Sequence, residues 1–290
     1  MKKSMAKSYP VYIADAFAEA PFSGNAAGVV FLGKDGFPDE KTCVALAAEL
    51  KHSETAFVRE VGENEFEIKY YTPVCEAALC GHATVAAFTA LRESGRVGTG
   101  DKKVHTTAGD ITVTVEQNAV WLDMAEARLI KYLDDNECRE LYAAYGIEFD
   151  PAVALRPAIV SVGLADIMTP VGSEKELDHA VQNEAAVAEL SRRLGVTGVH
   201  MFALGREGFT AACRNFAPLY GISEECATGT SNGGLYHYLV KNNVIREGSS
   251  AAFLQGEAMG RPSVVYAMSR GETVRVGGPG AVLIAGEIRL

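Results

Sequence analysis

The amino-acid sequence predicts an α+β protein of two similar halves, each a curled, mostly antiparallel sheet around a central helix. Many short apolar runs alternate with turn-forming residues, and each half of the chain has one prominent apolar run with helical spacing. In both halves that run follows a stretch with a cysteine, small residues and hydroxyls, and the two stretches lie about half the chain apart. These observations indicate an internal duplication.

Composition bounds the protein class. The chain has 290 residues, 48% of them hydrophobic and 22% charged, which is typical of a globular protein of one large or two smaller domains. A net charge of −10 without any Lys/Arg-rich run argues against nucleic-acid and membrane partners. No apolar run is long enough to span a membrane. Asp15 and Glu19 interrupt the start before a signal peptide could form, so we expect a cytoplasmic protein whose six cysteines are reduced.

The first half should contain a series of strands around two helices. A turn is expected at 21–26 and a Gly-rich loop at 94–101. Glu54 comes where the loop after the first helix leads into a strand. The expected strands are 9–17, 28–32, 56–58, 66–71, 104–107, 110–116 and 119–124, and the helices are 39–50 and about 82–93.

The second half repeats this style. A hairpin is expected around Gly163, and Gly195 should end a helix. The expected helices are 134–145, 183–194 and one that ends near 242, and the strands are 158–162, 166–170, 198–204, 208–216, 252–256, 263–269, 273–277 and 281–288. We place the domain boundaries at 1–118 and 119–275, with the last strand, about 276–290, returning to the first half.

The two cysteine-containing stretches are candidate halves of a functional site. The first contains Cys80, Gly81 and His82, and the second runs from Glu224 to Thr230. Each leads into a helix, whose N-terminal N–H groups and dipole can hold an anion such as a carboxylate. A thiol at such a position tends to have a lowered pKa.

Several motifs in the same order resemble the PhzF-like family of phenazine-biosynthesis isomerases. The resemblance spans nearly the whole chain, from about Val11 to the end. The motifs are Asp15-Ala16-Phe17, Pro21-Phe22-Ser23-Gly24-Asn25-Ala26-Ala27, Ser53-Glu54-Thr55-Ala56-Phe57, Tyr71-Thr72-Pro73, Leu79-Cys80-Gly81-His82-Ala83-Thr84, Arg214-Asn215-Phe216-Ala217-Pro218, Gly221-Ile222-Ser223-Glu224, Ala227-Thr228-Gly229, Gln255-Gly256-Glu257-Ala258-Met259-Gly260-Arg261-Pro262-Ser263 and Val274-Arg275-Val276-Gly277-Gly278.

This resemblance implies a diaminopimelate-epimerase-like fold with the site in a cleft between the halves, chemistry without a cofactor, and a homodimer. It implies that Glu54 is the general acid/base that moves a proton on a small carboxylate-bearing substrate, with His82 as a further catalytic residue. The expected substrate-binding residues are Asn25, Gly81, Glu225, Thr228, Gly229 and Thr230. Two positions depart from the usual pattern: Glu225 stands where the family has Asp, and Thr230 stands where Ser is usual.

Cys226 is the departure that opens a second mechanism. It stands where the PhzF-like pattern has Pro, and the related diaminopimelate epimerases and proline racemases begin the equivalent loop of each half with a catalytic cysteine. By that wider resemblance Cys80 and Cys226 form a two-thiol pair that racemises or epimerises an amino or hydroxy acid. A non-catalytic binding or scaffold protein is the alternative of another class.

Other kinds of site are not expected. Cys75, Cys80 and His82 do not have the spacing of a zinc site, so we expect no metal. No phosphate-binding glycine motif lies between a strand and a helix, which argues against a nucleotide. Four cysteines are expected to be structural, namely Cys43, Cys75, Cys138 and Cys213.

Overall fold

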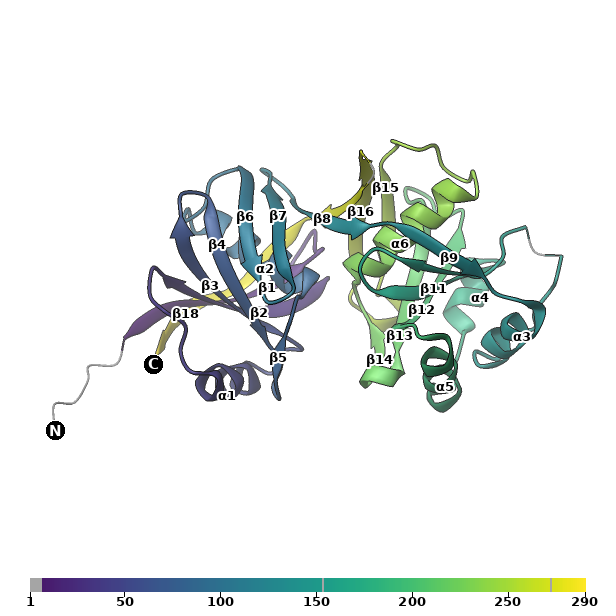
Figure 1. Ribbon diagram of the computed structural model, residues 1–290, viewed down its shortest axis with the longest axis horizontal. Coiled ribbons are helices and arrows are strands. Elements are labelled where there is room, and N and C mark those ends of the chain that lie inside the picture. Colours follow the sequence, from purple (N-terminus) through teal and green to yellow (C-terminus); the bar gives the residue numbers. More distant parts are fainter. Residues whose placement is uncertain (1–6, 153, 272) are drawn as a thin grey trace. The chain divides into compact units, whose positions relative to one another are not determined.

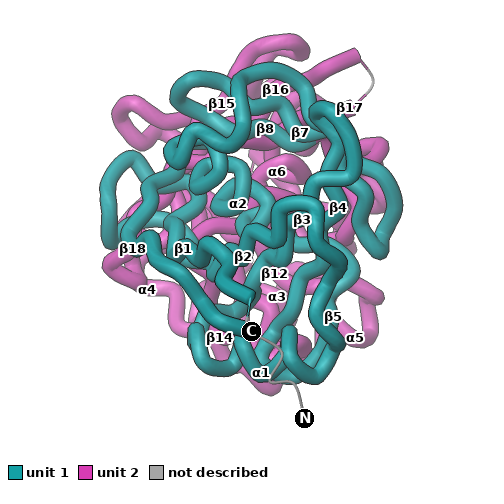
Figure 2. The backbone as a smooth tube through the Cα atoms, turned by 90° about the vertical axis from the view of Figure 1, so that its left-hand side faces the viewer, with its two compact units in different colours: residues 1–122, 278–290 teal, residues 123–277 magenta. Residues whose placement is uncertain are grey.

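The computed structural model describes residues 7–290 except 153 and 272 and divides into two compact units (Figures 1 and 2). Unit 1 comprises residues 1–122 and 278–290, and unit 2 comprises residues 123–277. The start of the chain up to residue 6 lies outside the described residues. Among the described residues, no helix is long and apolar enough to cross a membrane.

Unit 1 is a sheet that curls around the helix α2. In the sheet, β18 pairs with β1, β1 with β2, and the order continues through β3, β4, β6, β7 and β8. The elements are β1 (Ser8–Ala16), β2 (Asn25–Gly33), α1 (Glu40–Leu50), β3 (Thr55–Gly62), β4 (Glu65–Tyr71), β5 (Glu76–Ala77), α2 (Gly81–Glu93), β6 (Gly100–Thr106), β7 (Gly109–Val115), β8 (Val120–Glu126) and β18 (Gly280–Arg289).

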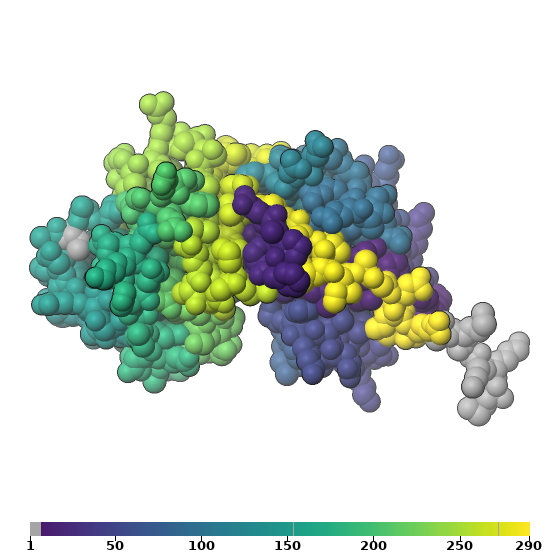
Figure 3. Space-filling model, turned by 180° about the vertical axis from the view of Figure 1, so that it is seen from behind, coloured from purple at the N-terminus to yellow at the C-terminus, as the bar shows by residue number. Residues whose placement is uncertain are grey.

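Helix α2 is the centre of unit 1 because every residue from His82 to Leu91 is buried. It packs against β1, β2, β3 and β18. Helix α1 lies on the opposite face of the sheet, where Cys43, Leu46 and Ala47 pack against Phe57 and neighbouring side chains. The expected return of the last strand is confirmed, since β18 pairs with β1 along its whole length; Figure 3 shows this strand in yellow at the surface.

Unit 2 has the same plan around α6. The sheet order is β9, β10, β11, β12, β13, β15, β16 and β17, and β14 pairs with β13. The elements are β9 (Arg128–Tyr132), α3 (Asp135–Ala143), β10 (Ala158–Ser161), β11 (Ala165–Val171), α4 (Glu174–His179), α5 (Glu184–Leu194), β12 (Gly198–Leu204), β13 (Ala211–Ala217), η1 (Pro218–Tyr220), β14 (Ile222–Glu225), α6 (Gly229–Lys241), β15 (Ala251–Gln255), η2 (Glu257–Met259), β16 (Ser263–Arg270) and β17 (Thr273–Gly278).

The internal duplication appears in the strand pairing. In unit 1 the parallel pairs β2–β3 and β4–β6 are joined by the antiparallel pair β3–β4. In unit 2 the parallel pairs β11–β12 and β13–β15 are joined by the antiparallel pair β12–β13. The central helix comes at the same step of each series, between β5 and β6 or between β14 and β15. The predicted α+β fold with two similar halves is therefore confirmed.

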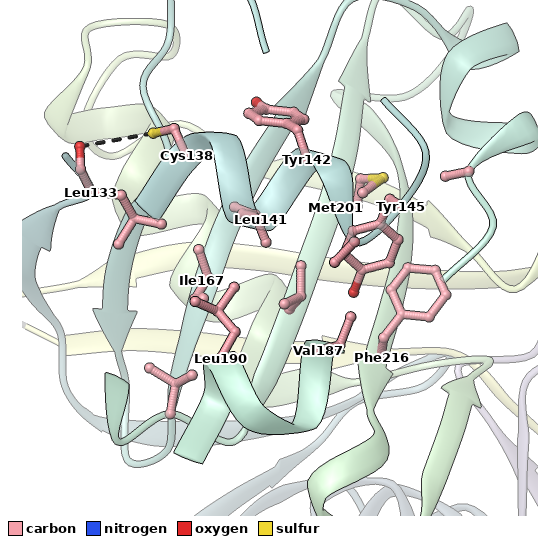
Figure 4. Packing of buried hydrophobic residues seen from close by; sticks show 14 of the residues in the cluster. Leu133, Cys138, Leu141, Tyr142, Tyr145, Ile167, Val187, Leu190, Met201 and Phe216 are labelled. Atoms are coloured by element: carbon pink, nitrogen blue, oxygen red, sulfur yellow. Dashed lines mark hydrogen bonds between the residues drawn. The ribbon is translucent and has the colours of Figure 1, made fainter. Parts of the chain in front are cut away.

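A second layer of helices covers the outer face of the unit 2 sheet. Helices α3 and α5 bury Leu141, Tyr142, Val187 and Leu190 against β11, β12 and Phe216, as Figure 4 shows. Burying side chains of this size contributes about 1.5–3 kcal/mol each relative to exposure. The sheet is therefore held rigidly between these helices and α6.

Some elements differ from the sequence-based expectation. Asn25 was placed in a turn, but it begins β2 because it pairs with Ala16 of β1. The strand expected at 208–216 begins only at Ala211. The short elements β9, α4 and β14 were not expected. Strand β9 and helix α4 are mostly exposed and have no apolar periodicity, so their pairing and capping contacts decide their structure. The hairpin at Gly163 and the helix end at Gly195 are confirmed.

Candidate active site

Glu54 is held at the edge of unit 1 where α1 passes into β3. Lys51 ends α1 in the left-handed conformation, with φ of 59°, and the chain then turns into the strand. The Gly28 N–H donates to the Glu54 carbonyl oxygen at 3.1 Å. A Cβ at Gly28 would lie 2.6 Å from Thr55 Oγ1, so only glycine lets β2 approach this closely. The backbone of Glu54 is thereby fixed before its side chain makes any contact.

Cys80 and His82 are positioned by the first turn of α2. Cys80 is the N-cap residue, and His82 is the second residue of the helix. The Thr84 hydroxyl donates its single proton to the Cys80 carbonyl oxygen at 2.7 Å. It must therefore accept the hydrogen bond from the buried Tyr70 hydroxyl, at 2.6 Å. Since Tyr70 belongs to β4, the sheet locks the helix start in place.

These elements bring Ser53, Glu54, Cys80 and His82 together, and we call this group the Glu54 cluster. His82 Nε2 lies 3.1 Å from Glu54 Oε2 and 3.3 Å from Ser53 Oγ. Cys80 Sγ lies 3.5 Å from His82 Nδ1. The His82 side chain is only 8% exposed, whereas that of Glu54 is 20% exposed. The Glu54 side chain is therefore partly accessible from outside the cluster, whereas His82 is almost fully enclosed.

Burial and the close contacts set the protonation of the Glu54 cluster. Burial raises the pKa of the Glu54 carboxyl, but the His82 ring and the Ser53 hydroxyl outweigh it, so this pKa lies below its usual value. Burial lowers the pKa of His82, but the Cys80 sulfur and the Glu54 carboxylate raise it well above the usual value. The cluster therefore favours an ionised carboxylate beside a protonated imidazole.

The expectation that a thiol at this helix N-terminus has a lowered pKa is wrong for Cys80. Burial raises the pKa of this thiol, and the nearby His82 ring offsets only part of the effect. Desolvation therefore decides the direction of the pKa shift at this position. The Cys80 sulfur lies within hydrogen-bond distance of His82 Nδ1, at 3.5 Å.

The same three side chains could hold a metal ion. One ligand atom each from Glu54, Cys80 and His82 lies within 4.8 Å of the others. A carboxylate, a thiol and an imidazole are ligand types that zinc accepts. The sequence spacing did not indicate this set, because Glu54 is distant from Cys80 and His82 in the sequence and lies beside them only in the folded chain.

Two other predicted residues of unit 1 lie near the ends of the same elements. Gly81 is the first residue of α2, and a Cβ there would meet no other atom within 4 Å. The helix start beside His82 therefore has open space next to it. Asn25 is buried at the first position of β2.

The predicted residues of unit 2 gather at the start of α6. Glu225 ends β14, Thr228 is the N-cap residue of α6, and Gly229 and Thr230 begin the helix. The Thr228 hydroxyl donates to Glu225 Oε2 at 2.8 Å. Cys226 is buried and lies two residues before the N-cap, whereas Cys80 is itself an N-cap. The two cysteines therefore do not hold equivalent positions relative to their helices.

Neighbouring acids in this loop have different environments. Arg214 donates to both carboxylate oxygens of Glu224 at 2.8 Å, and it also donates to two backbone carbonyls at 2.9 Å. Glu224 is therefore held by a structural ion pair, and Glu225 is the acid that faces the helix start. Sequence reasoning did not assign roles to Ser53 or Gln255, although both lie in quoted motifs; Gln255 contacts Thr228 from β15.

Comparisons with known proteins show the family of this chain. A family model described as "Phenazine biosynthesis-like protein" matches residues 14–286. The chain belongs to this family. Among curated members, "Uncharacterized isomerase YddE" of Escherichia coli K12 is 30% identical over 95% of this chain and 94% of its own length. An "Uncharacterized isomerase" of Deinococcus radiodurans is 34% identical over 92% of this chain and 90% of its own length.

Solved structures of the phenazine biosynthesis-like family share the fold. A PhzF-family protein of Enterococcus faecalis has a TM-score of 0.81 and 26% identity, covering 98% of this chain and 100% of its own. A hydroxyproline epimerase from Agrobacterium vitis has a TM-score of 0.66 at 12% identity, covering 99% of this chain and 92% of its own, and shows the fold alone. The curated relatives, which are named isomerases and match nearly the whole chain, make this chain an isomerase.

Proposed function

We propose that this isomerase moves a proton between carbons of a small carboxylate-bearing substrate, with Glu54 as the acid/base. The observation that carries the proposal is the contact at 3.1 Å between the Glu54 carboxylate and the buried His82 ring. A base for this reaction must be ionised, held in one orientation and able to reach the substrate. Glu54 meets these conditions because its carboxylate lies against the His82 ring, which the Ser53 hydroxyl also contacts, while part of the Glu54 side chain stays exposed.

The proposed reaction balances without a co-reactant. Glu54 takes a proton from carbon, and the electron pair of the broken C–H bond passes into the adjacent carboxylate or a conjugated double bond. Glu54 then returns the proton to another carbon of the substrate. The N-terminus of α2 at Gly81 offers backbone N–H groups and a positive dipole for the negative charge that develops. His82 keeps Glu54 oriented through both steps.

The experiment is a proton-exchange assay in D₂O. Wild-type protein is incubated with a panel of small amino, hydroxy and unsaturated carboxylic acids, in buffer with EDTA, and ¹H NMR follows the loss of each C–H signal. We expect exchange of at least one acid, and Glu54→Gln should lower its rate at least 100-fold, since general acid–base catalysis contributes about 10²–10⁴. The exposed Cys75→Ala is the matched control. Full exchange by Glu54→Gln would contradict the proposal. Wild-type exchange that occurs only when EDTA is left out of the buffer would also contradict it.

The two-thiol mechanism predicts a different pattern in the same assay. If Cys80 and Cys226 exchange the proton, Cys226→Ala abolishes exchange and Glu54→Gln retains it. The Glu54 mechanism is favoured because burial raises the pKa of Cys80. A wild-type protein that exchanges no acid of the panel would support a binding or scaffold role. The homodimer and the cytoplasmic location stay predictions.

A further inference from the structure

Unit 2 contains a continuous chain of polar side chains that the proposed reaction does not use directly. It starts on the strands next to α6 and ends at the loop that carries Glu225 (Figure 1). We call it the Asn215 chain. Its members are Asp166 on β11, His200 on β12, Asn215 on β13, Ser231 and Asn232 on α6, Gln255 on β15, and Thr228 and Glu225 before α6.

The inner members are buried as deeply as core residues. Asp166, His200, Asn215, Ser231, Asn232 and Gln255 are each at most 3% exposed. Burying polar groups without hydrogen bonds is costly, so the donors and acceptors of such a group should match in full. The matching can be checked bond by bond from Asn215.

One branch leads from Asn215 to a buried carboxyl group. Asn215 Nδ2 donates to Ser231 Oγ at 3.0 Å. Ser231 Oγ in turn donates to Asp166 Oδ2 at 2.6 Å. Each hydroxyl has one proton, so this branch has a single direction, from Asn215 to Asp166.

The other branch leads from Asn215 through a histidine. His200 and Asn215 are cross-strand partners, and Asn215 Nδ2 lies 3.3 Å from His200 Nδ1. Since an amide nitrogen can only donate, His200 Nδ1 accepts. His200 Nε2 then donates to Asn232 Oδ1 at 3.3 Å. The ring is therefore neutral with its proton on Nε2, and burial lowers the pKa of His200 to about 4, in agreement with this tautomer.

The second branch continues to the loop before α6. Asn232 Nδ2 donates to Gln255 Oε1 at 2.7 Å and to the Thr228 carbonyl at 3.0 Å. Gln255 Nε2 donates to the Glu225 carbonyl at 2.7 Å and to Thr228 Oγ1 at 3.1 Å. The Thr228 hydroxyl has then only one direction left for its proton, which is toward Glu225 Oε2 at 2.8 Å.

We propose that the Asn215 chain fixes the Glu225 carboxylate and the Thr228 hydroxyl in one orientation, and that Asn215 and Gln255 are positioning residues for the isomerase. This inference rests on the proposed function for its effect on turnover. The structural part of the inference does not depend on the proposed function. In both branches each hydrogen bond is donated in the direction away from the Asn215 amide, and each branch ends at a carboxyl group. No member can reverse its hydrogen bond without leaving a buried donor or acceptor unpaired.

The first test reads the donor order directly and needs no substrate. Protein with ¹⁵N-labelled histidine is titrated from pH 5.5 to 8.5, and the His200 signal is assigned with His200→Gln. We expect His200 to stay neutral with its proton on Nε2 over this range. In Asn215→Asp the amide donor becomes an acceptor that faces His200 Nδ1, so the ring should gain a proton on Nδ1. A wild-type ring with its proton on Nδ1, or one that Asn215→Asp leaves unchanged, would overturn the chain.

The second test reads the loop and the reaction. Gln255→Met keeps the side-chain size but removes both donors, and we expect amide hydrogen exchange in residues 225–228 to be at least tenfold faster. Thr169→Val is the matched control, because Thr169 is buried on β11 and its hydroxyl donates to the Ile167 carbonyl oxygen of the same strand. Unchanged exchange in Gln255→Met would overturn the positioning role.

Turnover is followed with the acid that the wild type exchanges in D₂O. Gln255→Met and Thr228→Val should lower kcat at least tenfold, while Thr228→Ser, which keeps the hydroxyl, should stay within about threefold of the wild type. Equal kcat in Thr228→Val and Thr228→Ser would overturn the role of the hydroxyl. Failure of the proposed function has a separate signature, since it leaves the histidine titration and the hydrogen exchange as expected but removes the effect of Glu54→Gln.

Discussion

The cost of burying Asp166 can be measured through the pH dependence of stability. Burial raises the pKa of Asp166 from 3.8 to about 6, although Ser231 and the Gly198 N–H donate to it. A raised pKa means that the folded state binds the proton more tightly than the unfolded state. Stability from this group is therefore lost as pH rises from about 4 to above 6. The shift corresponds to about 3 kcal/mol at high pH, of which about 2 kcal/mol falls between pH 4 and pH 8.

Asp166→Asn removes this titration and keeps an acceptor for Ser231. Urea unfolding followed by circular dichroism at pH 4, 6 and 8 gives the free energy of unfolding of each protein. From pH 4 to pH 8, the free energy of unfolding of the variant should rise by about 2 kcal/mol relative to that of the wild type. The exposed Glu148→Gln of the same unit serves as control. Curves for Asp166→Asn and wild type that stay parallel over this range would refute the reasoning.

Two further substitutions test how the site is held. Arg214→Met should lower the free energy of unfolding by about 3–5 kcal/mol, because it leaves the Glu224 carboxylate, whose side chain is only 15% exposed, without its partner; an effect below 1 kcal/mol in urea unfolding would argue against this. Gly28→Ala should cost about 1–3 kcal/mol through the contact with Thr55 Oγ1 and should lower the exchange rate by displacing Glu54, unlike the control Gly36→Ala, where a Cβ meets open space.

The candidate residues of the Glu54 cluster and of the Asn215 chain are held by two kinds of support. Glu54 is held by a short loop whose backbone is fixed through Gly28, and His82 is held by a buried helix. The loop of Glu225 is held by side chains from four strands and one helix. In each unit the central helix begins beside predicted site residues, and the buried flanks of the helix fix its first turn.

The sequence alone determined the class of fold, the repeated plan and the family. Apolar periodicity predicted α1, α2, α5 and α6 to within a few residues, since a mostly buried helix face leaves a regular pattern. The spacing of the two cysteine-containing stretches predicted the duplication. The motifs also predicted Glu54 and His82 as partners in one site, though no local pattern marks their contact. The short exposed elements left no such pattern and were missed.

Only the tertiary structure decided which side chains meet and how they are charged. Glu54 and His82 come together because the sheet that contains β3 curls around α2. Cys80 has a raised pKa because that packing desolvates it. The Asn215 chain joins residues from β11 to β15 that are far apart in the sequence. Hydrogen bonds between distant strands depend on register and burial, which residue spacing does not encode, so the tertiary structure was needed to find them.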